Sequence, residues 1–173
     1  LKFTDAIIFL TDNFNNIPKP TKNPEESETL ASTYGNRAAA LMMVGAYGAA
    51  SSDCAKGIAH LQGFNPLAMK VENQADLMSY FKPEGGLILM SKLSARMCRA
   101  YMKLGNVTEA EQAIKETIRI SDIAAKCHQK ILTYASEKGL CVPDETMKSS
   151  EKVLVHCRNN ATLNKNDLHT IKE

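Results

Sequence analysis

The chain has 173 residues, with 21 Lys and Arg against 19 Asp and Glu, so its net charge of +2 is close to balance. This length suits one domain or a compact array of repeats, and 44% hydrophobic residues are enough to build a core. The balanced charge, the few aromatic residues and the absence of Trp give no support to nucleic-acid binding, and no apolar run approaches the roughly 18 residues of a membrane span.

Five cysteines, an odd number scattered through helical segments, do not form a disulfide framework. They indicate reduced thiols, so we expect a cytoplasmic or nuclear protein. The chain does not begin with Met and opens inside an amphipathic segment. We therefore expect it to be part of a longer protein.

The first half of the chain predicts helices separated by breaks. Residues 2–14 carry apolar side chains at helical spacing, and a polar link with three prolines follows at 15–24. A helix over residues 24–44 opens with Pro and two acids and ends at Gly45. The next helix is expected over residues 47–61, before a break that contains Gly and Pro.

The second half begins with a weaker signal at residues 67–86, where 73–80 could be a short helix. A strong helix is then expected over residues 87–104, and it ends at Gly105. Beyond this glycine the sequence predicts helices at 107–120 and 123–138, a helix at about 145–158 capped by Asp144, and a polar end with a fraying helix near 167–172.

Residues 34–50 and 94–110 align about their internal turns. In both segments a helix ends at Gly, a hydrophobic residue stands two positions later, and an Ala stands five positions later in a second apolar helix. The Gly permits a tight turn, and the Ala lets two antiparallel helices approach closely. Residues 1–14 match the second helix of such a unit. The repeat therefore predicts stacked helix–turn–helix units.

These units resemble those of the tetratricopeptide-repeat (TPR) family, which have Gly, an aromatic residue and a small Ala at the same places. The resemblance implies an all-α fold, in which the repeats form a right-handed superhelical solenoid with a concave groove. An unrelated helical bundle is the alternative.

The resemblance also implies a domain organisation. Gly45 and Gly105 lie 60 residues apart, more than the roughly 34 of the family, so an insertion is expected between them. The expected parts are a TPR array at 1–138 and a C-terminal helix with a polar tail at 139–173. The array comprises a truncated repeat at 1–14, a repeat at about 28–62, an insertion at about 63–86, a repeat at about 87–121 and a weak further helix at 123–138.

The string Tyr34-Gly35-Asn36-Arg37-Ala38-Ala39-Ala40-Leu41-Met42-Met43 further resembles the TPR segments of J-domain and Hop-type co-chaperones. In that family a clamp of Lys, Asn and Arg grips the C-terminal Glu-Glu-Val-Asp tail of the cytosolic heat shock protein 70 and 90 classes. The resemblance places Asn36 at the second-repeat Asn, and Lys92 and Arg96 at the third-repeat pair. The resemblance implies that the first-repeat Lys and Asn would lie on a helix before residue 1.

The same residues make chemical sense without the family. Lys92 and Arg96 are four residues apart, so they share one helix face. Arg offers a bidentate fork to a carboxylate, Lys a point charge, and Asn36 a neutral donor. Arg99 extends this basic strip or is a plain surface charge. Basic residues on an amphipathic helix are commonly a solvated face, and this alternative stays open.

Other chemistry has little support in the sequence. The four histidines are well separated, and no Cys-x-x-Cys, His-Glu-x-x-His or phosphate-loop motif occurs. We therefore expect no metal, no cofactor and no enzymatic activity. Three hypotheses for function remain: a co-chaperone adaptor for an acidic chaperone tail, a TPR scaffold for an unrelated complex, and a TPR domain attached to an enzyme outside this chain.

Overall fold

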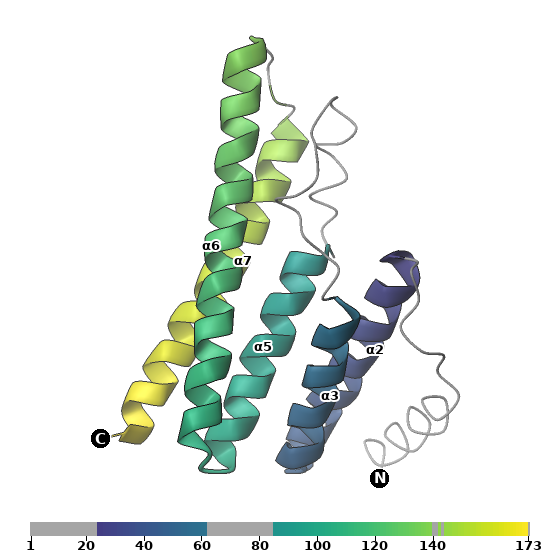
Figure 1. The fold of residues 1–173 in the computed structure, drawn as a ribbon, viewed down its shortest axis with the longest axis vertical. Helices are drawn as coiled ribbons and strands as arrows, with labels where there is room; N and C mark the ends of the chain where they lie inside the picture. Colours follow the sequence, from purple (N-terminus) through teal and green to yellow (C-terminus); the bar gives the residue numbers. More distant parts are fainter. Residues whose placement is uncertain (1–23, 62–84, 140–141, 143, 173) are drawn as a thin grey trace.

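The structure, a computed structural model, describes residues 24–61, 85–139, 142 and 144–172. These residues form helices without a strand, which confirms the predicted all-α class (Figure 1). The expected truncated repeat at 1–14 and nearly all of the expected insertion at 63–86 lie outside them. The helices are α2 (Pro24–Met43), α3 (Tyr47–His60), α5 (Gly86–Lys103), α6 (Val107–Lys138) and α7 (Asp144–Lys172).

The two turns that the sequence aligned have the same geometry. Gly45 and Gly105 adopt left-handed φ values of 78° and 75°, which a residue with a Cβ reaches only with strain. The amide of Ala46 donates to the carbonyl of Leu41 at 2.9 Å, and the equivalent bond 60 residues later has the same length. Each turn is a Schellman motif that caps the first helix and starts the second.

The helices follow one another side by side across the molecule (Figure 1). α3 packs between α2 and α5, α6 packs on α5, and α7 contacts both α5 and α6. α5 and α7 run parallel: Cys157 Sγ faces the Leu87 carbonyl near the start of the contact, and Leu168 packs with Cys98 near its end. Each helix therefore contacts the next one, and also the one after it in the case of α2–α5 and α5–α7.

The contact among α2, α3 and α5 depends on Leu93, which is fully buried. A Cβ added at Gly57 of α3 would lie 3.0 Å from Leu93 Cδ1 and 3.3 Å from the Ala31 carbonyl. A Cβ added at Gly35 of α2 would lie 3.3 Å from Leu93 Cδ2. The two glycines thus leave a notch that the Leu93 side chain occupies, and the three helices meet there.

The structure corrects the prediction of two helices at 107–120 and 123–138. α6 is one helix of 32 residues, about 48 Å long at a rise of 1.5 Å per residue. Nothing between Ile120 and Ile123 breaks a helix, and the buried stripe continues across this point at Ile120, Ala124, Cys127, Ile131 and Ala135. The upper half of α6 extends past α5 and packs on α7 (Figure 1).

The helix expected at 145–158 is longer than predicted: it continues to Lys172 as α7 and includes the region of the expected fraying helix near 167–172. Asn164 is 1% exposed and Leu168 is 9% exposed, so the end of this helix is packed into the molecule. The buried positions of this stretch include Asn where a core usually has an apolar residue. Because a buried position is polar, the apolar periodicity that predicts a helix is weak in this stretch.

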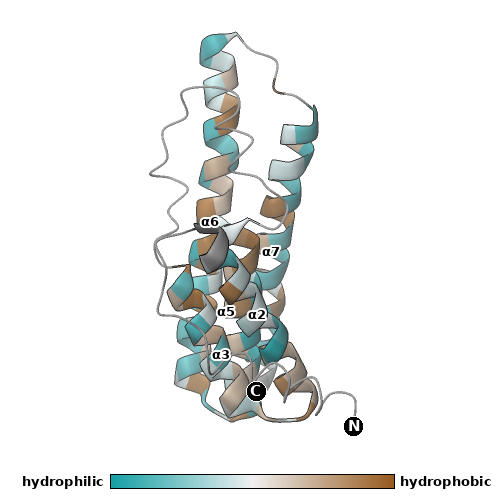
Figure 2. Cartoon of the chain, turned by 90° about the vertical axis from the view of Figure 1, so that its right-hand side faces the viewer, coloured by the Kyte–Doolittle hydropathy of each residue, from teal (hydrophilic) through white to brown (hydrophobic). Residues whose placement is uncertain are grey.

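Hydrophilic and hydrophobic residues are mixed along the helices, as Figure 2 shows for α6 and α7. Among the described helices, none combines the length and the apolarity needed to cross a bilayer. The apolar side chains are used instead between helices, in a main cluster that joins all five and a smaller one at the lower end of α5, α6 and α7.

The notch around Leu93 gives a first testable prediction. Gly57→Ala should destabilise the protein by about 1–3 kcal/mol, because the new methyl group would overpack against Leu93 and the Ala31 carbonyl. Gly48→Ala in the same helix is the control: a Cβ there meets nothing within 4 Å, so a gain of about 0.5 kcal/mol is expected. Urea unfolding of both variants measures the two effects, and equal effects would contradict the notch.

Candidate functional site: a cationic strip on α5

Three of the four predicted site residues lie along one side of α5. Lys92 and Arg99 are exposed, and Arg96 between them is half-buried. Their positions are separated by one helical turn each, so they form a continuous strip. Among the described residues, none of the three forms an ion pair with a carboxylate. The strip therefore carries positive charge that the described part of the chain leaves uncompensated.

Arg96 reaches from α5 to the backbone of α2. Its Nη1 donates to the Gly35 carbonyl oxygen at 2.9 Å, and the missing side chain of Gly35 makes room for it. Burial lowers the pKa of the Arg96 guanidinium, and the positive charge of Arg99 adds to this effect, whereas Cys54 opposes it. The guanidinium is thus partly desolvated, and its hydrogen-bond partner in the described part of the chain is a neutral carbonyl.

Arg37 on α2 has the opposite environment. Its Nε and Nη2 donate to the two carboxylate oxygens of Asp53 on α3, both at 2.5 Å, and both side chains are largely buried. The bond to Asp53 raises the pKa of Arg37. Arg37 also lies over the Tyr34 ring, which stacks on His60. Arg37 therefore has a complete structural role between α2 and α3.

Asn36, the fourth predicted residue, is exposed on α2. It follows Gly35, whose carbonyl binds Arg96, so the structure brings Asn36 to the α2–α5 junction where Arg96 lies. Asn36 is thus next in the chain to the residue that Arg96 contacts, and its grouping with Arg96 in one site stays a prediction. Lys92 and Arg99 lie one turn before and one turn after Arg96 on α5.

Two residues of α7 that the sequence did not single out as a site flank the strip. Asn160 Nδ2 donates to Ser91 Oγ at 2.8 Å, and Ser91 is the residue before Lys92 in the sequence. The same nitrogen lies 3.1 Å from His156 Nε2. In the sequence, His156 and Cys157 are an adjacent pair with no motif that indicates a site. The spacing of four residues between His156 and Asn160 was the signal that could have revealed them.

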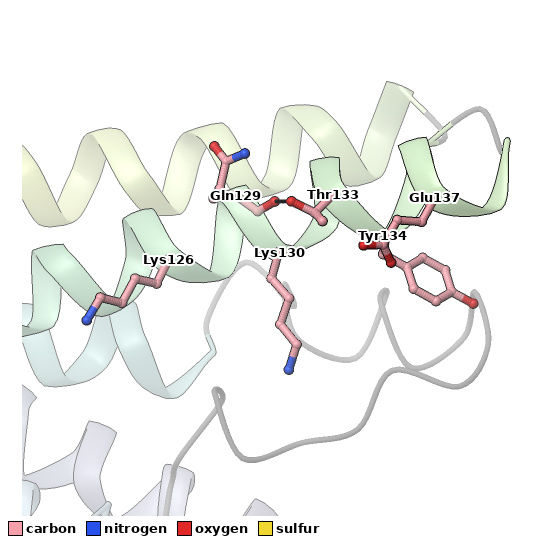
Figure 3. A pocket seen from close by; sticks show the side chains of 6 residues that line it. All are labelled: Lys126, Gln129, Lys130, Thr133, Tyr134 and Glu137. Carbon is pink, nitrogen blue, oxygen red and sulfur yellow. Dashed lines mark hydrogen bonds between the residues drawn. The ribbon is translucent and has the colours of Figure 1, made fainter.

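A separate surface hollow of about 420 Å³ lies on the upper half of α6. Figure 3 shows its described lining residues, which all come from this one helix, and the bond from Thr133 Oγ1 to the Gln129 carbonyl at 3.0 Å. Polar groups from a second described element do not converge on it. The lining consists of Lys126, Gln129, Lys130, Thr133, Tyr134 and Glu137.

Metal binding and thiol chemistry find no support in the described residues. No group of three or more His, Cys, Asp or Glu side chains there could hold a metal ion. Cys54, Cys98, Cys127 and Cys157 are free and buried, which confirms the expected unpaired thiols for these four, and Cys141 lies outside the description. Burial raises the pKa of Cys54 to about 12 and of the other three to about 11.

The thiol pKa values predict low reactivity. At about pH 8 only on the order of one in a thousand or fewer of these thiols is ionised, and the thiolate is the nucleophile. We expect Cys54, Cys98, Cys127 and Cys157 to resist a thiol reagent in the native protein and to react together in denaturant. Mass spectrometry of the labelled residues checks this. Fast native labelling of Cys54 would contradict its burial.

The different partners of Arg37 and Arg96 predict different effects on the free energy of unfolding. Asp53→Asn should cost on the order of 3 kcal/mol, because it leaves Arg37 buried without its carboxylate. Arg96→Met should change the free energy of unfolding by less than about 1 kcal/mol or stabilise the protein, since it removes a desolvated charge while filling similar space. Chemical denaturation compares them. A loss at Arg96 as large as that at Asp53 would show that Arg96 is structural.

A scan against protein-family models found no match to this chain, and neither did searches of curated proteins and of solved structures. The resemblance to the TPR family therefore stays a prediction. It rests on the aligned residues of the sequence and is consistent with the equal geometry of the Gly45 and Gly105 turns.

Proposed function

We propose that this chain is a TPR-type scaffold that binds the C-terminal segment of a partner protein through carboxylate recognition at Asn36, Lys92, Arg96 and Arg99. The expected partner is an acidic tail such as the Glu-Glu-Val-Asp terminus of the heat shock protein 70 and 90 classes. The proposal concerns binding, not catalysis.

The observation that carries the proposal is the state of Arg96. A guanidinium that is partly removed from water is stable when a carboxylate accepts its forked hydrogen bonds, as Asp53 does for Arg37. Arg96 is also partly removed from water, but its described partner is the neutral Gly35 carbonyl, bound by Nη1 alone. Its other N–H groups can donate to a carboxylate from outside the chain. Such a ligand would also relieve the repulsion between Arg96 and Arg99.

The arrangement of the helices is compatible with a repeat scaffold. α2 and α5 are the first helices of two helix–Gly–helix units, and they contact each other directly. In a solenoid of this type the first helices line the concave face, where adjacent units form a shared groove. Asn36 on α2 and the strip on α5 would then face one groove. In this groove Asn36 would donate to the peptide backbone, while the cationic side chains of α5 would bind carboxylates.

Calorimetry with a synthetic peptide ending in Glu-Glu-Val-Asp tests the proposal. The unmodified peptide should bind, and the same peptide with an amidated C-terminus should bind at least about tenfold more weakly, because it lacks one carboxylate. Arg96→Met should weaken binding by a similar factor. Lys115→Met is the matched control, since Lys115 is an exposed cation on α6 away from the strip, and it should leave binding unchanged.

Two results would overturn the carboxylate proposal. The first is the absence of binding by the wild-type chain. The second is equal binding of the free and amidated peptides, with no effect of Arg96→Met. The second result would favour a scaffold that assembles another complex through different residues.

A further inference from the structure

The junction between α5 and α7 places a titratable side chain beside the cationic strip. Asn160 bridges the two helices by donating to Ser91 Oγ at 2.8 Å. Its Nδ2 also lies 3.1 Å from Nε2 of His156, one helical turn earlier on α7. Ser91 is fully buried, whereas His156 is half-buried and Lys92 is exposed. The bridge therefore fixes the imidazole at the edge of the strip.

The hydrogen bonds determine which form of His156 is present. An amide nitrogen is a donor, so Nε2 of His156 accepts from Asn160 and carries no proton. The ring is then neutral, with its proton on Nδ1. Burial lowers the pKa of His156, and the positive charge of Lys92 lowers it further. Both effects keep the imidazole neutral at pH 7 in the free chain.

The charged groups around His156 come from few elements. On α5, Lys92 is the charged side chain whose field acts on it. On α6, His128 forms a side-chain hydrogen bond to α7, but its partner is Ser150, almost two turns before His156. On α7 itself, exposed Lys152 lies one turn earlier. No carboxylate of the described chain is among the groups that act on the His156 pKa.

We propose that His156 is a further ligand-binding residue of the groove, and that its protonation adds a third-helix contact to an acidic side chain of the bound peptide beside Lys92. This inference rests on the proposed function and deepens it. It extends the recognition surface from α2 and α5 to α7. It also makes affinity depend on pH, because a bound carboxylate favours the charged imidazolium.

The proton balance of the step is simple. The peptide carboxylate accepts from Nδ1–H of His156, and the ring takes up one proton from solvent onto Nε2, the nitrogen that faces Asn160. The new N–H of His156 can no longer accept from Asn160, so the Asn160 amide turns and offers its oxygen to the imidazolium. Ser91 Oγ, which accepted from Asn160, then donates to the same oxygen. The α5–α7 bridge is thereby preserved with its direction reversed.

The sign of the pH dependence follows from this linkage. The free chain has a lowered His156 pKa, and the bound carboxylate raises it, so the complex holds more protons than the free components. Affinity should therefore increase as pH falls from about 8 to about 5.5, where peptide carboxylates are still mostly ionised. A pKa change of roughly half to one unit corresponds to an increase of roughly three- to tenfold.

The experiment measures binding of the Glu-Glu-Val-Asp peptide at about pH 8 and about pH 5.5, with calorimetry in buffers of different ionisation enthalpy to count protons. The wild-type chain should bind more tightly at the lower pH with proton uptake. In His156→Gln the ratio of the two dissociation constants should fall to about one. His169→Gln, at an exposed position near the end of α7, should keep the wild-type ratio.

A second measurement does not depend on how well the His156→Gln variant folds. NMR titration of the imidazole signals should show a higher His156 pKa in Lys92→Met than in the wild-type chain, and a higher one with peptide than without. Two results would overturn this inference alone. The first is tight binding by the wild-type chain with equal dissociation constants at the two pH values. The second is an unchanged ratio of these constants in His156→Gln. The absence of peptide binding at both pH values overturns the proposed function and this inference with it.

Discussion

Leu93 occupies the notch that Gly35 leaves on α2 and Gly57 on α3, and the arrangement of the first three described helices depends on this contact. The added Cβ at Gly57 would come within 3.0 Å of the Leu93 side chain, so α5 lies as close to the first helix pair as side-chain volume permits. Close approach lets one leucine bury its whole side chain against two helices at once. Two glycines inside helices, each costing up to about 1 kcal/mol in helix propensity, are offset by this packing.

The same close approach creates the candidate site. Arg96 is one turn beyond Leu93 on α5, and it reaches the Gly35 carbonyl because Gly35 has no side chain. The guanidinium of Arg96 is therefore partly buried, and no carboxylate of the described chain pairs with it. Arg37, in contrast, is paired with the carboxylate of Asp53. The two arginines thus have different partners, a carboxylate for Arg37 and a neutral carbonyl for Arg96. The proposed site thus costs stability that a bound carboxylate would restore.

α7 connects the site to the rest of the molecule. It packs parallel to α5 and contacts it through Cys157, Asn160 and Leu168. Several buried positions of this interface are polar, and Ser94 Oγ and the Asn164 amide nitrogen are buried without a hydrogen-bond partner among the described residues. A polar interface of this kind has fewer ways to pack than an apolar one, because each group needs a specific neighbour. The position of His156 beside Lys92 is a consequence of that register.

The sequence by itself determined the helix–Gly–helix units, because glycine in a left-handed turn and helical periodicity are local properties that a single chain segment expresses. It also led to the prediction of a site at Asn36, Lys92, Arg96 and Arg99, through the resemblance to co-chaperone TPR segments, and this site stays a prediction. Only the tertiary structure decided that α6 continues through Ser121 and that α7 continues to Lys172, since their buried faces become favourable only against each other and α5. It alone distinguished Arg37 from Arg96 and placed His156 at the strip, because pairing, burial and the α5–α7 register join residues far apart in the chain.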